Sequence, residues 1–450
     1  MKIDNIRELA LKSLYKIDTE NAYSNIVLDE VLNKNREKIN NRDIGFISEL
    51  VYGVTTWKLT LDCIIQKYSK LRIKKISKWI INILRLGAYQ IIFLDKIPKS
   101  AAVNESVNLS KKYGAKSSNF VNAILRKIEK KDFEELQNIE DDVQRISKTT
   151  SMPEWIVEEL LKDNEITKVE EICRNSNIKP KISIRVNTLK TNRKILKQKL
   201  DELEIKYIDG ILEDFLYLEN VKNITSLEIY KQGLFTMQDE AAGLTSLVLM
   251  PKEGEIVLDC CSAPGGKTTH LAEIMNNKGK ILAWDLYENR LNLVKENANR
   301  LGINIIETNV CNSTDFDSKM VEKFDKVLLD VPCLGLGVIR RKPDIKWQRK
   351  KEDIQNINNE QLKIINNCSK YLKKGGLLLY STCSIINSEN DKIIQEFLKE
   401  NKFEIVNPKN SKIEKFKNNI TDKLDIKLYP NNKNDGFYMC LLRKIGWFVK

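Results

Sequence analysis

Residues 236–450 contain short apolar segments that alternate with longer amphipathic ones, and this alternation constrains the fold more than any other feature. Five segments have the length and composition of buried strands: 255–259, 280–285, 304–307, 326–330 and 377–380. Helices are expected between them, near 267–275, 289–301 and 354–372. Strands that alternate with helices build a doubly wound, largely parallel sheet.

The rest of the chain divides by its patterns into two further parts. Residues 1–145 show apolar side chains at helical spacing, as at Ile6, Leu9 and Leu14, and end in an acidic stretch, 134–142, that is typical of a linker. Residues 146–235 mix short helices and strands. We therefore expect an all-helical domain over 1–145, a small α+β module over 146–235 and a Rossmann-like α/β domain over 236–450.

Composition excludes several classes of protein. The chain has one histidine, His270, and nine cysteines without a C-x-x-C pair. A metal site built from several histidines is excluded, and neither a zinc site nor a disulfide framework is expected. The sequence shows neither a membrane-spanning apolar run nor a signal-peptide core at its start, so we expect a cytoplasmic protein.

The positive charge is concentrated in one region. The net charge is +13, and residues 61–130 carry 15 Lys and Arg against 4 Asp and Glu, an excess of 15 − 4 = 11. A basic helical segment is the electrostatic footprint of a nucleic-acid partner. A solvated lysine-rich surface would have the same composition, so both interpretations stay open on composition alone.

Chemically reactive side chains follow two of the expected strands. Asp330 and Cys333 come directly after the strand at 326–330, and Cys383 comes directly after the strand at 377–380. In an open α/β sheet, ligands bind at the carboxyl ends of the strands. The two thiols and the aspartate are therefore expected to meet a substrate there.

A glycine-containing loop links the first strand of this domain to its helix. Gly265 and Gly266 allow a ligand to approach the helix N-terminus closely. A Walker A loop is disfavoured, because position 261 is Cys where that motif needs glycine. Asp285 ends the next strand, 285 − 266 = 19 residues on, where a carboxylate can hold ribose hydroxyls. This pattern favours an adenosine ligand without phosphates, namely S-adenosylmethionine.

These motifs resemble those of the RsmB/Sun family of RNA cytosine-5 methyltransferases. The matching segments of the catalytic part are 259–268, 330–347, 380–390 and 435–438. The N-terminal part is similar to the NusB-like RNA-binding domain, and its matching segments are 84–90, 98–111 and 120–126. The resemblance covers nearly the whole chain. It implies a monomeric enzyme that methylates cytosine in 16S rRNA, the RNA of the small ribosomal subunit.

The resemblance also implies roles for single residues. Cys383 would attack C6 of the cytosine, and Cys333 would assist removal of the C5 proton and release of the product. A covalent catalyst is needed because C5 is a poor nucleophile until C6 has been attacked. Asp330 is placed to bind the cytosine edge, and Cys311 stands where the family has an aspartate near the adenine. The expected cofactor-binding residues are Cys261, Ser262, Ala263, Pro264, Gly265, Gly266, Lys267, Asp285, Cys311 and Asp330.

Three alternatives remain. The substrate could be a tRNA or another rRNA cytosine. The chain could be a NusB-like RNA-binding factor without activity, which the presence of Cys333 and Cys383 disfavours. The two thiols could also have the reverse roles, because cytosine-5 enzymes that act on DNA attack with the thiol of the Asp/Pro-type motif.

Overall fold

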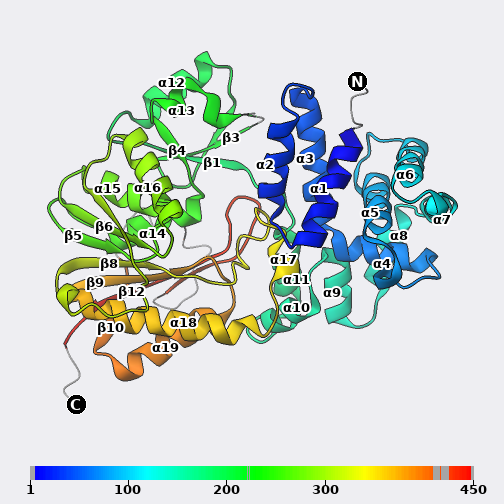
Figure 1. The fold of residues 1–450 in the computed structure, drawn as a ribbon. Helices are drawn as coiled ribbons and strands as arrows, with labels where there is room; N and C mark the ends of the chain where they lie inside the picture. Colours follow the sequence, from blue (N-terminus) through cyan, green and yellow to red (C-terminus); the bar gives the residue numbers. More distant parts are fainter. Residues whose placement is uncertain (1–5, 220, 222, 409–415, 417–424, 447–450) are drawn as a thin grey trace. The chain divides into compact units, whose positions relative to one another are not determined.

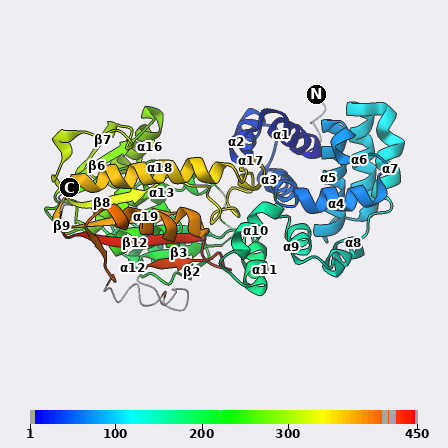
Figure 2. The same cartoon turned by 90° about the horizontal axis from the view of Figure 1, so that it is seen from below.

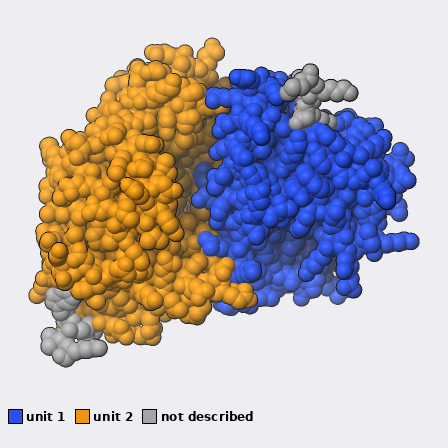
Figure 3. Space-filling model, viewed as in Figure 1, with its two compact units in different colours: residues 1–178, 339–351 blue, residues 179–338, 352–450 orange. Residues whose placement is uncertain are grey.

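The structure is a computed structural model, and it describes residues 6–219, 221, 223–408, 416 and 425–446. Two compact units are coloured separately in Figure 3. Unit 1 comprises residues 1–178 and 339–351, and unit 2 comprises residues 179–338 and 352–450. Residues 339–351 interrupt unit 2 in the sequence but belong to unit 1, and we call them the inserted segment. The domain boundaries expected near 145 and 235 stay predictions.

Unit 1 is helical throughout its described residues (Figure 1). Its α-helices are α1 (Ile6–Glu20), α2 (Ser24–Lys34), α3 (Asn41–Thr56), α4 (Lys58–Tyr68), α5 (Lys78–Phe93), α6 (Lys99–Gly114), α7 (Ser118–Leu125), α8 (Lys131–Glu134), α9 (Asp142–Thr150), α10 (Glu154–Leu161), α11 (Ile166–Asn175) and α17 (Ile345–Gln348). Short 3₁₀ turns are η1 (Ile73–Lys75), η2 (Ala115–Ser117) and η3 (Glu135–Asn138).

Helix α5 lies at the centre of unit 1. It contacts α1, α3, α4, α6 and α7, and every residue from Ile80 to Ile92 is buried. A helix that is apolar on nearly all sides can be stable only when it is surrounded in this way.

The acidic stretch at 134–142 is helical over most of its length rather than a plain linker. It contains η3 and the first residue of α9, and Asp141 caps α9 by accepting a hydrogen bond from Gln144 N at 2.8 Å. Asp141 and Asp142 stand at the N-terminus of α9, where negative side chains are preferred.

Unit 2 begins with the predicted small α+β module. Its elements are β1 (Ile182–Val186), α12 (Arg193–Glu202), β2 (Tyr207–Asp209), β3 (Phe215–Leu218), η4 (Ile224–Ser226), α13 (Glu228–Lys231) and β4 (Phe235–Met237). The strands form an antiparallel sheet in the order β2-β3-β1-β4. Leu196 and Leu200 of α12 pack against apolar residues of this sheet and form a small core with them.

The larger sheet follows. Its elements are α14 (Glu240–Leu249), β5 (Ile256–Asp259), α15 (Gly266–Ile274), β6 (Lys280–Asp285), α16 (Glu288–Leu301), β7 (Ile306–Val310), η5 (Ser318–Met320), β8 (Phe324–Asp330), α18 (Asp353–Cys368), η6 (Ser369–Tyr371), β9 (Leu372–Thr382), η7 (Asn387–Glu389), α19 (Asp391–Glu400), β10 (Phe403–Ile405), β11 (Ile426–Leu428) and β12 (Phe437–Lys444). The strand order is β10-β12-β9-β8-β5-β6-β7, and β11 pairs with β12.

Helices cover both faces of this sheet (Figures 1 and 2). Successive strand residues point to opposite sides. Val257 packs in one core with α14, α15 and α16, and the next residue, Leu258, packs in another core with α18 and α19. Strands β5 to β9 pair in parallel. This confirms the predicted doubly wound domain.

The sheet differs from the prediction in the bounds of β7 and β9 and in three additional strands. β7 begins at Ile306 instead of residue 304 and continues through polar residues, because it is the edge strand and needs no fully apolar pattern. β9 begins at Leu372 instead of residue 377, so Gly375 and Gly376 lie inside the strand. β10, β11 and β12 were not predicted; β12 pairs antiparallel with β9, and β10 and β11 pair antiparallel with β12.

Candidate functional site

The carboxyl ends of three adjacent strands bring most of the predicted site together. Asp330 at the end of β8 pairs with Ser381 of β9, and Asp259 at the end of β5 pairs with Leu328 of β8. The loops that leave these strand ends carry Cys333, Cys383 and the glycine loop. The parallel register therefore gathers residues that are far apart in sequence.

The two predicted catalytic thiols lie next to each other. Cys333 Sγ and Cys383 Sγ are 3.2 Å apart, although 50 residues separate them in the chain. Both side chains are half-buried. The hydrogen bond with Cys383, together with burial, raises the pKa of the Cys333 thiol well above its usual range.

A lysine and an aspartate form an ion pair in this region. Lys267 Nζ donates to Asp330 Oδ2 at 2.6 Å, and Ser381 Oγ donates to Asp330 Oδ1 at 3.2 Å. The ammonium also lies 4.9 Å from the centre of the Phe437 ring. Burial opposes the charge of Lys267, but the adjacent Asp330 carboxylate outweighs it, so the pKa of Lys267 is raised. A cation is thus held beside the strand ends.

The glycine loop turns tightly between β5 and α15. Gly265 has φ +98°, and a Cβ at this position would lie 3.1 Å from Val294 Cα, so the loop requires glycine there. The peptide bond between Ala263 and Pro264 is cis. Ser262 N and Oγ both donate to Trp284 O, at 2.8 and 3.0 Å. These bonds hold the loop against β6.

A pocket of about 190 Å³ opens at this loop. Seven of the expected cofactor-binding residues line it: Cys261, Ser262, Ala263, Pro264, Gly266, Lys267 and Asp330. Met237, Gln238, Ala242 and Asp259 also line it and were not predicted as cofactor-binding residues. Two buried polar atoms of this lining, Gln238 Nε2 and Asp259 Oδ1, have no hydrogen-bond partner. Burial raises the pKa of Asp259 to about 7. Orphaned donors and acceptors of this kind fit a polar ligand such as S-adenosylmethionine.

Three of the expected cofactor residues stand outside this lining. Gly265 acts through its backbone turn. Asp285 is buried, and its carboxylate accepts from Ala263 N at 3.3 Å and from Arg290 at 3.2 Å. Cys311 N donates to Asp285 O at 3.1 Å. Asp285 therefore supports the loop itself, whether or not it also contacts a ribose.

The loop after β8 carries Cys333 and the loop after β9 carries Cys383, and we call them the thiol loops. The residues that join these two loops were not assigned a role from the sequence. Gly337 N donates to Cys383 O at 2.9 Å, and Gly436 N donates to Gly337 O at 2.8 Å. A Cβ on Gly337 would lie 2.2 Å from Gly436 O, so only glycine fits. Glu389 and Gln361 also contact these loops. The signal in the sequence that could have pointed to these residues was the presence of glycines and polar residues without an assigned role in and near the motifs.

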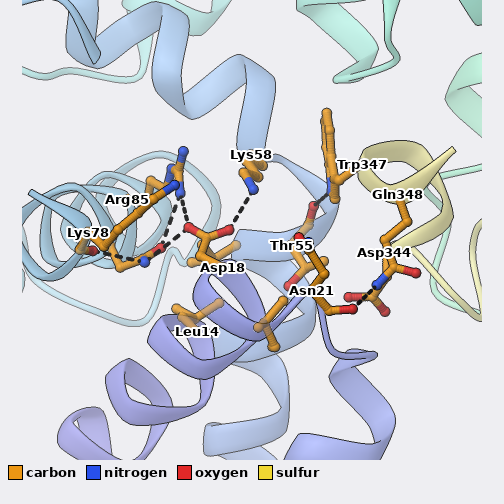
Figure 4. A pocket seen from close by; sticks show the side chains of 13 residues that line it. Leu14, Asp18, Asn21, Thr55, Lys58, Lys78, Arg85, Asp344, Trp347 and Gln348 are labelled. Atoms are coloured by element: carbon orange, nitrogen blue, oxygen red, sulfur yellow. Dashed lines mark hydrogen bonds and ion pairs between the residues drawn. The ribbon is translucent and has the colours of Figure 1, made fainter. Parts of the chain in front are cut away.

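A second pocket, of about 170 Å³, lies within unit 1 (Figure 4). Asp344, Trp347 and Gln348 of the inserted segment line it together with residues of the helices. Asp18 accepts from Lys58 at 2.6 Å and from Arg85 at 2.7 Å, so these charges satisfy one another. Trp347 Nε1 donates to Thr55 O at 2.7 Å. This arrangement is typical of a packing contact that anchors the inserted segment.

The described residues contain no helix long and apolar enough to cross a membrane. They also contain no group of three or more His, Cys, Asp or Glu side chains placed to hold a metal ion.

Three family models match the chain. The model of the NusB family matches residues 4–130, that of the RsmF/B-like ferredoxin-like domain matches residues 152–225, and that of the 16S rRNA methyltransferase RsmB/F matches residues 246–443. Together with the fold and the site, these matches define the class of the protein: it is an S-adenosylmethionine-dependent rRNA methyltransferase.

Similar proteins of other organisms identify the family within this class. A probable ribosomal RNA small subunit methyltransferase B from Bacillus subtilis is 37% identical over 99% of this chain and 100% of its own length. A ribosomal RNA small subunit methyltransferase B from Shewanella oneidensis is 32% identical over 88% of this chain and 90% of its own length. The chain therefore belongs to the RsmB/F family of 16S rRNA methyltransferases.

Solved structures agree with this fold. The crystal structure of PH0851 has a TM-score of 0.80 and 26% identity, and the match covers 98% of this chain and 99% of that one. NSun6 from Pyrococcus horikoshii with SFG has a TM-score of 0.58 and 22% identity, and the match covers 65% of this chain and 98% of that one. At this identity, NSun6 shows a shared fold.

Proposed function

We propose that this enzyme transfers a methyl group to C5 of a cytosine in 16S rRNA through a covalent adduct between Cys383 and C6. The observation that carries the proposal is the 3.2 Å separation of Cys333 Sγ and Cys383 Sγ beside the Lys267–Asp330 pair. Covalent activation of a pyrimidine requires a soft nucleophile and a second group that handles protons. Two adjacent thiols supply both.

In this mechanism, the Cys383 thiolate adds to C6 of the cytosine, and the electron pair of the C5–C6 double bond moves toward C5. S-adenosylmethionine, when bound, supplies the electrophilic methyl group that C5 receives. Removal of the C5 proton then restores the double bond as the bond between sulfur and C6 breaks, which frees the Cys383 thiolate. Asp330 would hold the cytosine edge, and Lys267 fixes the orientation of its carboxylate.

The contact between the thiols bears on this division of roles. The hydrogen bond with Cys383, together with burial, raises the pKa of the Cys333 thiol. As a thiol, Cys333 can donate its hydrogen bond to Cys383, which favours the Cys383 thiolate for attack. Once Cys383 is bonded to C6, Cys333 loses this partner, and it can accept the C5 proton only after its own proton has left.

Cofactor and partner complete the proposal. S-adenosylmethionine would bind the lining of the pocket at the glycine loop, residues 261–267 with Asp330, and Asp285 would reach its ribose. The basic residues within 61–130 would bind the RNA. The relatives are named as methyltransferases of small-subunit ribosomal RNA, which favours 16S rRNA over tRNA as the substrate. A monomeric state and a cytoplasmic location stay predictions.

A denaturing gel tests the roles of the thiols. With 16S rRNA and S-adenosylmethionine, we expect Cys333→Ala to accumulate a retarded, protease-sensitive protein–RNA band, because elimination stalls once C6 has been attacked. Cys383→Ala and the double variant should give neither band nor methylation. Cys63→Ala, which alters a thiol of unit 1, should match the wild type. A band with Cys383→Ala and none with Cys333→Ala would reverse the assignment, and full methylation by both variants would refute it.

A further inference from the structure

The side chain of Glu389 connects the two loops that carry the thiols. Glu389 ends η7 and is completely buried. Its Oε1 accepts a hydrogen bond from Leu334 N at 2.8 Å, and its Oε2 accepts one from Ser384 Oγ. Leu334 directly follows Cys333, and Ser384 directly follows Cys383. One carboxylate therefore spans the two residues that adjoin the thiols.

Neighbouring side chains extend this connection around Cys333. Gln361 of α18 is completely buried. Its Nε2 donates to Pro332 O at 2.9 Å and to Glu389 Oε1 at 3.3 Å. Pro332 and Leu334, the residues before and after Cys333, are thus both bonded to the Glu389–Gln361 pair.

The Cys383 side is held in the same way. Asn390, also completely buried, accepts from Thr382 Oγ1 at 2.6 Å and donates to Ser384 O at 3.1 Å. Tyr380 OH donates to Glu389 O at 2.7 Å, which ties η7 to the end of β9. These bonds connect the end of β9, η7 and both loops that carry the thiols, and Gln361 Oε1 is the one buried side-chain polar atom of the described residues Glu389, Gln361 and Asn390 without a hydrogen-bond partner. A buried network of this kind restricts the positions of the loops that it joins.

We propose that Glu389 is a positioning residue that holds Cys333 and Cys383 at the sulfur separation needed for attack and release. This inference rests on the proposed function of the two thiols. A carboxylate suits the task because both of its oxygens are acceptors and its bonds to N–H and O–H donors are charge-assisted. An amide in its place would present an NH₂ group to one of two donors, and one loop would lose its tether.

Disulfide formation between the two thiols measures this geometry without any methylation. Diamide removes two electrons and two protons from a pair of thiols and is itself reduced to the hydrazine, and the reaction requires the sulfur atoms to meet. In the full-length protein without RNA, we expect Glu389→Gln to form the Cys333–Cys383 disulfide at least about 10-fold more slowly than the wild type. Mass spectrometry of the alkylated, digested protein identifies that disulfide among the nine cysteines.

Glu240→Gln is the matched control. Glu240 is also completely buried, and it accepts from a backbone N–H, Leu212 N, and from a hydroxyl, Tyr217 OH, both at 2.5 Å. It thus shares the bonding pattern of Glu389 but contacts neither thiol loop through these bonds. Its disulfide rate should equal that of the wild type. Ser384→Ala, which removes one of the two tethers, should fall between the wild type and Glu389→Gln.

Kinetics complete the test. We expect Glu389→Gln to lower kcat about 100-fold, with the KM for S-adenosylmethionine changed less than 3-fold, because positioned proton transfer contributes about 10²–10⁴-fold to rates. The inference is overturned if the disulfide rate of Glu389→Gln stays at the wild-type value, or if Glu240→Gln slows it equally. If the thiol-to-alanine variants methylate normally, the proposed function fails while the disulfide result still decides what Glu389 positions.

Discussion

Two lysines that are largely enclosed, one beside a carboxylate and one beside neutral acceptors, have pKa values shifted in opposite directions. The side chain of Lys267, in the pocket at the glycine loop of unit 2, is 15% exposed and lies 2.6 Å from the Asp330 carboxylate. Lys346 of the inserted segment in unit 1 is 1% exposed, and its ammonium donates to Thr56 O at 2.7 Å and to Asn177 Oδ1 at 3.0 Å, which are both neutral acceptors. The pKa of Lys267 is raised, whereas burial lowers the pKa of Lys346 to about 7.

The difference shows that a counter-ion, rather than burial alone, decides whether a lysine keeps its charge. At the pocket, the Asp330 carboxylate preserves a cation beside the thiols. In unit 1, carbonyl oxygens satisfy the N–H groups of Lys346 without compensating its charge. Its side chain also lies 5.4 Å from the Trp347 ring, so it serves packing and hydrogen bonding within the anchored segment.

The strongest test removes the counter-ion of Lys267. Asp330→Asn should lower the methylation rate about 10²–10⁴-fold, because the carboxylate that pairs with Lys267, and that we propose binds the cytosine edge, is lost. Single-turnover assays with 16S rRNA measure this rate.

A second aspartate of β8 serves as the control. Asp325 is paired with Lys373 at 2.7 Å at the opposite end of the strand. Asp325→Asn should keep more than half of the activity, and equal losses in both variants would show that Asp330 acts only through stability.

The next test concerns the pH dependence of stability that Lys346, the lysine without a counter-ion, should cause. The unfolded chain keeps the Lys346 proton up to pH 10.5, whereas the folded chain loses it near pH 7. Between these values the unfolded state binds more protons, so the free energy of unfolding should rise with pH, on the order of 5 kcal/mol in total. This stability is lost as the pH falls through 7.

Lys346→Met removes the titrating group. Urea unfolding at several pH values should therefore show a smaller rise for Lys346→Met than for the wild type, while Lys342→Met, which alters an exposed lysine of the same segment, should follow the wild type. Parallel curves for the wild type and Lys346→Met would mean that Lys346 is charged when buried, like Lys267.

The smallest effect is expected at exposed lysines. Lys74, Lys75 and Lys111 are exposed, whereas Lys112 is paired with Glu8 at 2.5 Å. If the first three contact phosphates, their reversal to Glu should flatten the salt dependence of RNA binding by about 2 units of slope, since each contact contributes about 0.7–0.9. Filter binding at increasing salt measures the slope.

Reversal of Lys231, Lys252 and Lys399, which are exposed in unit 2, is the control with equal charge change. The same slope for both triple variants would mean that only net charge matters and that the basic segment of unit 1 is not the RNA-binding surface.

Local patterns were enough to predict most of the fold and part of the site. The strand at 280–285 and the helix of α16 follow directly from apolar periodicity, because side chains repeat every two residues in a strand and every 3.6 in a helix. The proximity of Cys333 and Cys383 also follows from sequence, since both come directly after strands, and adjacent parallel strands end at one edge. The position of the glycine loop at this edge was predicted because the loop directly follows the parallel strand β5.

Long-range pairing was decided only by the tertiary structure. The antiparallel β12, the transfer of residues 339–351 to unit 1 and the use of the Asp285 carboxylate by the loop backbone depend on partners far away in the chain. The connection of the thiol loops through Glu389 is of the same kind. The sequence by itself determined which elements form and which chemistry they carry, because these depend on local periodicity and residue type. Only the folded chain decided which charges are compensated and how far apart the thiols lie, because both depend on register and packing.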